Sequence, residues 1–143
     1  MKLGDLLAGV ALEECHADLE TEITGVSYDS RKTAAGDLFA AMTGYAADGH
    51  DFIPAAAEKG AVCVLCERAP EIDIPWVRVA SARRALALLS ANWFSHPAEE
   101  MVMIGVTGTN GKTTTTYLLK NILEEAAGAT VGLIGTNQNM IGS

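Results

Sequence analysis

The most informative stretch of the sequence is Gly108-Thr109-Asn110-Gly111-Lys112-Thr113-Thr114. Apolar residues at 101–106 predict a strand before it, and residues 112–127 predict a helix after it. Glycines at such a turn let backbone N–H groups surround a phosphate, and the start of the helix adds a partial positive charge. With a second strand at 131–134, the stretch predicts a β-loop-α-β unit that binds the phosphates of a nucleotide.

The polar residues of this stretch have separate expected roles. Lys112 is expected to reach the terminal phosphates of the nucleotide, and Thr113 to offer its hydroxyl to Mg²⁺. Thr114 is expected to cap the helix or to touch a phosphate. The general pattern G-x-x-x-x-G-K-[ST] is not met, because Val106 stands five residues before Gly111. An ordinary strand-turn-helix corner is the alternative, but a Lys-Thr pair at the helix start favours phosphate binding.

The N-terminal two thirds of the sequence alternate between predicted strands and helices. Helical patterns cover 1–11, 52–59 and 81–94, and strand patterns cover 23–28, 38–42, 62–66 and 76–79. The proline-bearing stretch at 95–100 separates these elements from the phosphate loop. The sequence therefore predicts an α/β protein with one domain at 1–98 and the start of a second at 99–143.

Composition and charge exclude several classes of function. The 143 residues carry 10 basic and 18 acidic side chains, a net charge of −8, which gives no basic surface for nucleic acid or anionic membranes. No stretch approaches the roughly 20 apolar residues that would span a bilayer, and the start does not resemble a signal peptide. We therefore expect a cytoplasmic protein with no nucleic-acid or membrane partner.

The three cysteines are candidates for a metal or redox site. Cys15, Cys63 and Cys66 make an odd number, which is unlike the disulfide framework of a secreted protein. Cys63 and Cys66 form a C-x-x-C pair, but residues three apart on a strand point to opposite faces. Since no second Cys or His pair completes a zinc set, metal or redox function is the minor alternative.

The sequence resembles the Mur ligase family over nearly its whole length. The phosphate loop at 107–114 reads T-G-T-N-G-K-T-T, which is typical of that family. The stretches 28–31, 36–41 and 48–53 resemble the uridine-nucleotide-binding domain of the same enzymes. The MurE branch is the best match. The MurF branch shares the D-S-R and D-G-H elements, but it more often differs where this sequence has Thr109 and Asn110.

The resemblance implies a reaction that uses ATP as a substrate together with Mg²⁺, a catalytic role for Lys112 and a set of contact residues. It implies an ATP- and Mg²⁺-dependent amide ligase that adds the third amino acid to UDP-N-acetylmuramoyl-L-alanyl-D-glutamate through an acyl phosphate, in peptidoglycan precursor synthesis. The fold implied is a small uridine-nucleotide-binding α/β domain followed by the first β-loop-α-β unit of a P-loop ATP-binding domain. The residues implied to contact the uridine-diphosphate part are Tyr28, Ser30, Tyr45, Ala46 and Ala47.

Two polar residues of the family motifs are expected to serve structure. Arg31 is expected to bond Asp29 or to hold its loop and not to contact the ligand, because exposed arginines are common. His50, in the Asp-Gly-His turn, is expected to be a turn or packing residue and not a catalyst.

The sequence is also compatible with other functions. The sequence reaches only about one βαβ unit into the ATP domain, so the 143 residues alone are expected to be inactive as a ligase. A stand-alone uridine-nucleotide-binding module and the MurF ligase are the alternatives. A generic P-loop NTPase would leave the motifs at 28–31 and 48–53 unexplained. The third amino acid, whether meso-diaminopimelate, lysine or another amine, is not indicated.

Overall fold

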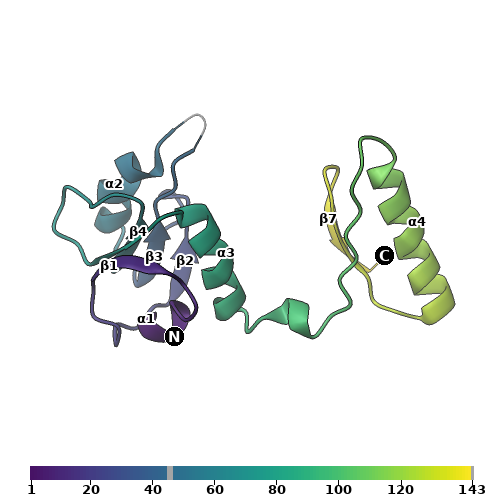
Figure 1. The fold of residues 1–143 in the computed structure, drawn as a ribbon, viewed down its shortest axis with the longest axis horizontal. Helices are drawn as coiled ribbons and strands as arrows, with labels where there is room; N and C mark the ends of the chain where they lie inside the picture. Colours follow the sequence, from purple (N-terminus) through teal and green to yellow (C-terminus); the bar gives the residue numbers. More distant parts are fainter. Residues whose placement is uncertain (45–46, 143) are drawn as a thin grey trace. The chain divides into compact units, whose positions relative to one another are not determined.

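The chain consists of two compact units. A computed structural model describes residues 1–44 and 47–142, and its internal contacts divide the chain into unit 1, Met1–Glu100, and unit 2, Met101–Ser143 (Figure 1). Over the described residues, none of the helices combines the length and the apolar character needed to cross a membrane.

Unit 1 is built on a five-stranded sheet with the strand order β1-β5-β4-β3-β2. Four neighbouring strands are parallel: β2 (Gly25–Ser27), β3 (Asp37–Ala40), β4 (Cys63–Cys66) and β5 (Trp76–Val79). The fifth, β1 (Leu12–His16), pairs with β5 in the antiparallel direction and forms one edge. Because β2 to β5 are parallel, the loops that leave their carboxyl ends begin along one edge of the sheet.

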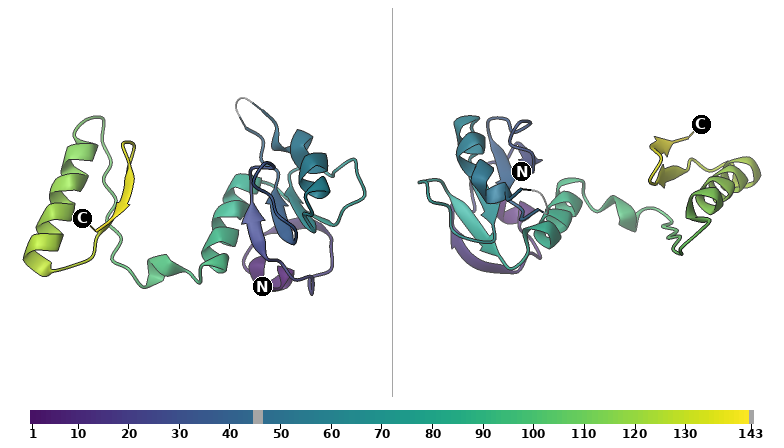
Figure 2. Two further views of the ribbon diagram at one scale, coloured as in Figure 1. Left: turned by 180° about the vertical axis from the view of Figure 1, so that it is seen from behind. Right: turned by 90° about the horizontal axis from the view of Figure 1, so that it is seen from above.

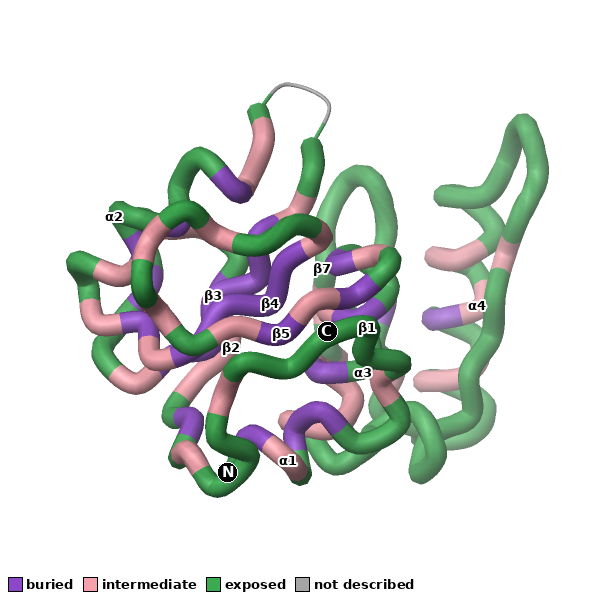
Figure 3. The backbone as a smooth tube through the Cα atoms, turned by 60° about the vertical axis from the view of Figure 1, so that its left-hand side comes forward, coloured by how far each residue is buried: buried purple, intermediate pink, exposed green. Residues whose placement is uncertain are grey.

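Helices cover both faces of this sheet, as a parallel sheet requires. The short α1 (Leu3–Leu6) and the longer α3 (Ala82–Trp93) pack on one face, and α2 (Ile53–Glu58), preceded by the 3₁₀ turn η1 (Gly49–Phe52), packs on the other (Figure 2). Alternate strand residues feed the two layers, so Leu65 joins the α1/α3 side and Val64 the α2 side. Figure 3 shows the result: β3 and β4 are buried throughout, whereas β1 is exposed along its length.

Unit 2 contains one long helix and a hairpin. The helix α4 (Lys112–Ala127) ends at Gly128, which takes the left-handed conformation, and β6 (Gly132–Ile134) pairs with β7 (Asn139–Ile141). A short 3₁₀ turn, η2 (Pro97–Glu99), stands at the end of unit 1.

The strand predicted at 101–106 is not formed. This apolar run has no hydrogen-bonded partner strand among the described residues, and β6 pairs with β7 instead of with it. A strand exists only as part of a ladder, so an apolar pattern without a neighbour leaves the segment irregular. Residues 101–105 are accordingly exposed, with Val102 91% exposed.

The first elements of unit 1 also differ from the prediction. The helix predicted at 1–11 is a single turn, because Gly9 takes a positive φ of 75° and the chain then enters β1. β1 itself was not predicted. Its five residues are all exposed, so pairing with β5 through the backbone, and not an alternating apolar pattern, makes it a strand.

The two cysteines of β4 lie on opposite faces of the sheet, which confirms the prediction from strand alternation. Cys63 packs in the core layer of α1 and α3, and Cys66 packs in the layer of α2. Burial raises the pKa of the Cys63 thiol to about 12 and that of Cys66 to about 11. The two sulfur atoms therefore act as small apolar core groups on separate faces.

The core of unit 1 should depend on Leu65, which is fully buried in the centre of the sheet. We expect Leu65→Ala to lower the free energy of unfolding by about 2–5 kcal/mol, because the truncation leaves a cavity. Urea denaturation followed by tryptophan fluorescence measures this, since both tryptophans, Trp76 and Trp93, belong to unit 1. Leu88→Ala, at a position 43% exposed, is the control and should change stability by less than about 0.5 kcal/mol. Equal stabilities of the two variants would contradict the assignment of the core.

Candidate functional site

The phosphate loop of unit 2 is an exposed turn that leads directly into α4. Gly108 has a φ of 144° and Gly111 a φ of 75°, conformations that side-chain-bearing residues rarely adopt. Gly111 is the N-cap residue of α4, and no side chain of the described residues caps this helix start. The amides of the first turn are thus left for an external acceptor, which is the arrangement that binds anions.

The side chain of Lys112 folds back over the phosphate loop that precedes it. Its Nζ donates a hydrogen bond of 2.6 Å to the carbonyl oxygen of Gly108. Thr113 and Thr114 follow it in the first turn, and both are exposed. The structure therefore places the seven residues of the predicted ATP site, 108–114, on one continuous exposed turn with a single cation above it.

The segment after β2 carries the first residues of the predicted substrate site. Tyr28 is 66% exposed, and Ser30 is partly exposed in the same turn. Asp29, which lies between them, accepts three hydrogen bonds from Arg31. The donors are the backbone N of Arg31 at 3.0 Å, its Nε at 2.9 Å and its Nη2 at 2.8 Å. These bonds hold the pKa of Asp29 at about 2. The expectation that Arg31 bonds Asp29 is confirmed.

The loop after β3, called here the 43–48 loop, carries the other predicted substrate residues. Tyr45 and Ala46 lie outside the described residues, and Ala47 is exposed. One backbone hydrogen bond crosses the loop: the amide N of Gly44 donates to the carbonyl O of Ala47 at 3.1 Å. Because β2 and β3 are parallel neighbours, this loop leaves the sheet at the same edge as Tyr28.

Gly49 makes the closure of this loop possible. Its amide N donates to the carbonyl O of Met42 at 2.8 Å, and a Cβ at position 49 would lie only 2.5 Å from the backbone N of Met42. Only glycine permits two backbone segments to approach this closely. A steric requirement therefore explains why the Asp-Gly-His motif has glycine at position 49.

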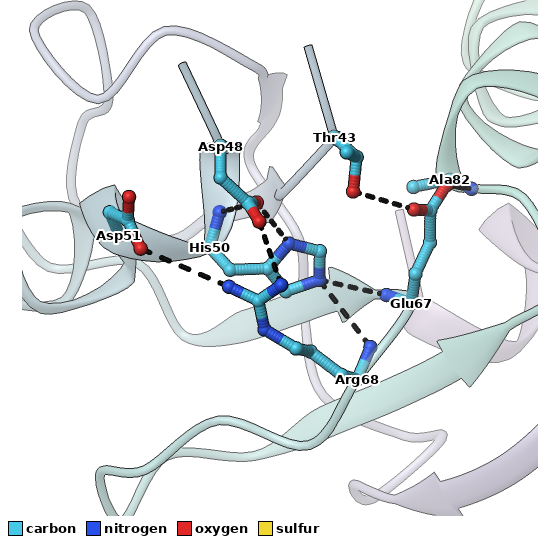
Figure 4. Close-up of polar contacts among 7 residues, drawn as sticks. All are labelled: Thr43, Asp48, His50, Asp51, Glu67, Arg68 and Ala82. Carbon is cyan, nitrogen blue, oxygen red and sulfur yellow. Dashed lines mark hydrogen bonds and ion pairs between the residues drawn. The ribbon is translucent and has the colours of Figure 1, made fainter.

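The buried His50 joins the 43–48 loop to the end of β4 (Figure 4). Its Nε2 accepts hydrogen bonds from the backbone N of Glu67 at 3.0 Å and of Arg68 at 3.4 Å. The proton of the neutral ring is therefore on Nδ1, which donates to Oδ1 of Asp48 at 2.6 Å. Both ring nitrogens are engaged, so the expectation that His50 is a turn and packing residue is confirmed.

Asp48 is the most strongly bonded carboxylate of this cluster. It accepts hydrogen bonds from the backbone N of His50 at 2.9 Å and from its ring, and Nη1 of Arg68 lies 2.7 Å from its Oδ2. These bonds, above all the two from His50, lower its pKa to about 2. Arg68 also approaches Oδ1 of Asp51 at 3.8 Å, so its charge is shared between two carboxylates.

A pocket of about 340 Å³ lies beside this cluster, between η1 and the loop that follows β4. Its lining includes His50, Arg68 and Pro70, and of the described residues predicted to contact the substrate it includes neither Tyr28, Ser30 nor Ala47. Glu67 and Arg68 were not singled out from the sequence. The signal that could have found them is their position: two charged residues directly after a buried strand, at the edge where the loops gather.

The parallel sheet of unit 1 and the glycine-lysine turn at the start of α4 define an α/β protein of the P-loop class. Residues 22–102 match the Mur ligase family, catalytic domain, and residues 106–143 match the Mur ligase middle domain. The first match alone covers more than half of the chain. The chain therefore belongs to the Mur ligase family.

Individual relatives agree with this membership. The chain is 44% identical over 144 residues to the UDP-N-acetylmuramoyl-L-alanyl-D-glutamate–2,6-diaminopimelate ligase 1 of Clostridium acetobutylicum, covering 99% of this chain and 30% of that protein. Among solved structures it is similar to MurF of Acinetobacter baumannii, with a TM-score of 0.70, 31% identity, and coverage of 87% and 27% of the two chains. The MurF ligase of Thermotoga maritima in complex with ADP gives a TM-score of 0.55, 33% identity, and coverage of 73% and 24%. The chain thus spans about a third or less of the length of these proteins.

The loss of folding stability at acidic pH should depend on the hydrogen bonds that Asp48 accepts. A carboxyl group whose pKa is about 2 in the folded state and near 3.8 when unfolded stabilises the fold above pH 4, and this contribution is lost as the pH falls to 2. We therefore expect Asp48→Asn to be less stable than the wild type at pH 6, with the difference shrinking towards pH 2. Urea midpoints measured by tryptophan fluorescence at several pH values test this. Asp51→Asn, which alters a carboxylate 72% exposed, should follow the wild type at every pH. A constant difference between the wild type and Asp48→Asn would contradict the assignment.

Proposed function

We propose that unit 2 binds the phosphates of ATP and that unit 1 binds a uridine nucleotide, as parts of an amide ligase of peptidoglycan precursor synthesis. The observation that carries the proposal is the phosphate loop, where an uncapped helix start and Lys112 meet. The reaction proposed is the addition of an amino acid to UDP-N-acetylmuramoyl-L-alanyl-D-glutamate. Both substrates are small anionic molecules, and we expect the reaction in the cytoplasm, with no membrane or nucleic-acid partner.

The proposed ATP site consists of Gly108, Thr109, Asn110, Gly111, Lys112, Thr113 and Thr114. Lys112 now bonds a neutral carbonyl, so a phosphate oxygen can replace that acceptor without breaking an ion pair. The exposed Thr113 hydroxyl at the helix start is an oxygen ligand of the kind that Mg²⁺ accepts alongside phosphate oxygens. When bound there, Mg²⁺ would supply charge neutralisation for the triphosphate.

The proposed uridine-nucleotide site lies at the carboxyl edge of the sheet. Tyr28, Ser30 and Ala47 belong to loops that leave the neighbouring strands β2 and β3 at this edge, which is where parallel sheets commonly bind ligands. The Ser30 hydroxyl can donate or accept a hydrogen bond, and the exposed ring of Tyr28 offers a surface for a base or a sugar. Tyr45 and Ala46, outside the described residues, complete the proposed set.

The proposed reaction proceeds in two balanced steps. The carboxylate of the glutamate residue attacks the γ-phosphorus of ATP, which releases ADP and leaves an acyl phosphate. The amine of the incoming amino acid then attacks the acyl carbon, and phosphate and a proton leave as the amide forms. The first step brings two anions together, so Lys112 and the loop amides serve it by positioning and neutralising the triphosphate.

The incoming amino acid is proposed to be 2,6-diaminopimelate. The support is the 44% identity to a ligase that carries this amino acid in its name. The similarity to MurF reflects a shared fold, and related ligases keep this fold while their substrates differ.

Removal of the Ser30 hydroxyl should weaken binding of the muramoyl nucleotide. We expect Ser30→Ala to raise the dissociation constant of UDP-N-acetylmuramoyl-L-alanyl-D-glutamate by roughly 5- to 20-fold, the effect of losing one hydrogen bond to a charged or polar ligand. Calorimetric titration of the folded chain, with UDP as a second ligand, measures it. Ser90→Ala is the matched control, since the Ser90 hydroxyl bonds the carbonyl O of Leu86 within α3. Equal affinities of Ser30→Ala and the wild type would show that Ser30 does not contact the ligand.

Removal of the Lys112 ammonium should weaken binding of Mg-ATP. We expect Lys112→Ala to raise the dissociation constant at least about tenfold, because a charge-assisted bond to phosphate is lost. Fluorescence titration with an ATP analogue in the presence of Mg²⁺ gives the constant. Arg83→Ala removes a positive charge from the exposed face of α3 and should bind as the wild type does. If both variants bind equally, the role given to Lys112 is wrong.

A further inference from the structure

Glu67 is the residue on which both ends of the 43–48 loop converge. It follows β4 directly, and neither the phosphate loop nor the proposed contact residues include it. We propose that Glu67 is a positioning residue of the uridine-nucleotide site, which holds the two described ends of the 43–48 loop, at 43–44 and 47–48, in place for binding. The inference rests on the proposed function of that loop.

The carboxylate of Glu67 bridges the start of the loop and the start of α3 (Figure 4). Its Oε2 accepts a hydrogen bond from Oγ1 of Thr43 at 2.9 Å, and its Oε1 accepts one from the backbone N of Ala82 at 2.8 Å. Ala82 is the first residue of α3, whose side chain is fully buried. One carboxylate therefore ties the first residue of the loop to a helix anchored in the core.

The backbone of the same residue holds the other end of the loop. The amide N of Glu67 donates to Nε2 of His50, and Nδ1 of that ring donates to Asp48, the last residue of the loop. Thr43 and Asp48 also pair across the loop as an isolated β-bridge. The two ends are thus fixed to each other and, through one residue, to the end of β4.

This anchoring matters for the part that Ala47 is proposed to play in the uridine-nucleotide site. Ala47 has only a methyl side chain, so the position of its peptide groups, and not a choice of rotamer, decides what it can bond. A loop held only at its backbone closure would lose conformational entropy on binding, and this cost lowers affinity. Fixing both ends beforehand removes part of the cost, which is the effect expected of a positioning residue.

The chemistry of the Glu67 contacts supplies a graded set of variants. Glu67→Ala removes both side-chain bonds. Glu67→Gln can keep both, because its carbonyl oxygen can accept from Ala82 N–H while its NH₂ group donates to the Thr43 hydroxyl. Thr43→Val removes the loop bond alone at an exposed, extended position that suits valine. Glu71→Ala alters an exposed glutamate of the following loop and is the matched control.

Calorimetric titration with UDP-N-acetylmuramoyl-L-alanyl-D-glutamate, well below each variant's unfolding temperature, tests the proposal. We expect Glu67→Ala and Thr43→Val to bind about tenfold more weakly than the wild type, and Glu67→Gln and Glu71→Ala to bind within about threefold of it. The double variant should bind no more weakly than Glu67→Ala, because the two residues act through one bond. A purely structural role would lower unfolding temperatures while leaving the affinity of the folded samples unchanged.

The outcomes separate this role from the proposed function. If the wild type binds no uridine nucleotide, the proposed function of unit 1 fails and the role of Glu67 fails with it. If the wild type binds but Glu67→Ala and Thr43→Val bind equally well, only the positioning role is overturned. Should Glu67→Ala not fold, the affinity of Thr43→Val decides, since that change leaves the Ala82 bond intact.

Discussion

Parallel pairing of four short strands is the constraint on which the rest of unit 1 depends. It requires apolar cover on both faces, which α1 and α3 supply on one side and α2 on the other. It also directs every connection from a carboxyl end to the same edge, so segments distant in sequence meet there. Tyr28, the 43–48 loop and Glu67 are neighbours for this reason and not because of any local sequence pattern.

The electrostatics of the chain follow from how its few cations are used. In an acidic protein with a net charge of −8, several basic side chains are neutralised by nearby carboxylates, as in the pairs of Arg31 with Asp29, Arg68 with Asp48 and Lys120 with Glu124. Lys112 differs, because its partner is the carbonyl oxygen of Gly108. Among the described residues no carboxylate forms an ion pair with Lys112, so an anionic ligand at this helix start gains from both the ammonium and the backbone amides.

The sequence was sufficient where local signals decide the structure. β5 is found at the predicted residues, α3 begins after its Ser81 cap, and α4 begins at the predicted lysine. It was insufficient where pairing decides: the run at 101–106 finds no neighbour, and the polar β1 becomes a strand only through β5. In the candidate sites, the bond of Arg31 to Asp29 spans two residues and was predictable, whereas the contact of His50 with Glu67 spans 17 and depends on the sheet.

The placement of the cysteines determines how this protein meets thiol reagents and oxidants. The thiolate is the reactive form, and at neutral pH the two buried thiols of β4 remain almost wholly protonated. Cys15, on the exposed edge strand, is the accessible one of the three. A dye or a spin label would therefore attach at one defined position of unit 1. A C-x-x-C pattern is often typical of a redox centre. Here the two cysteines stand on one strand, so their thiols lie in two separate core layers and do not react with each other.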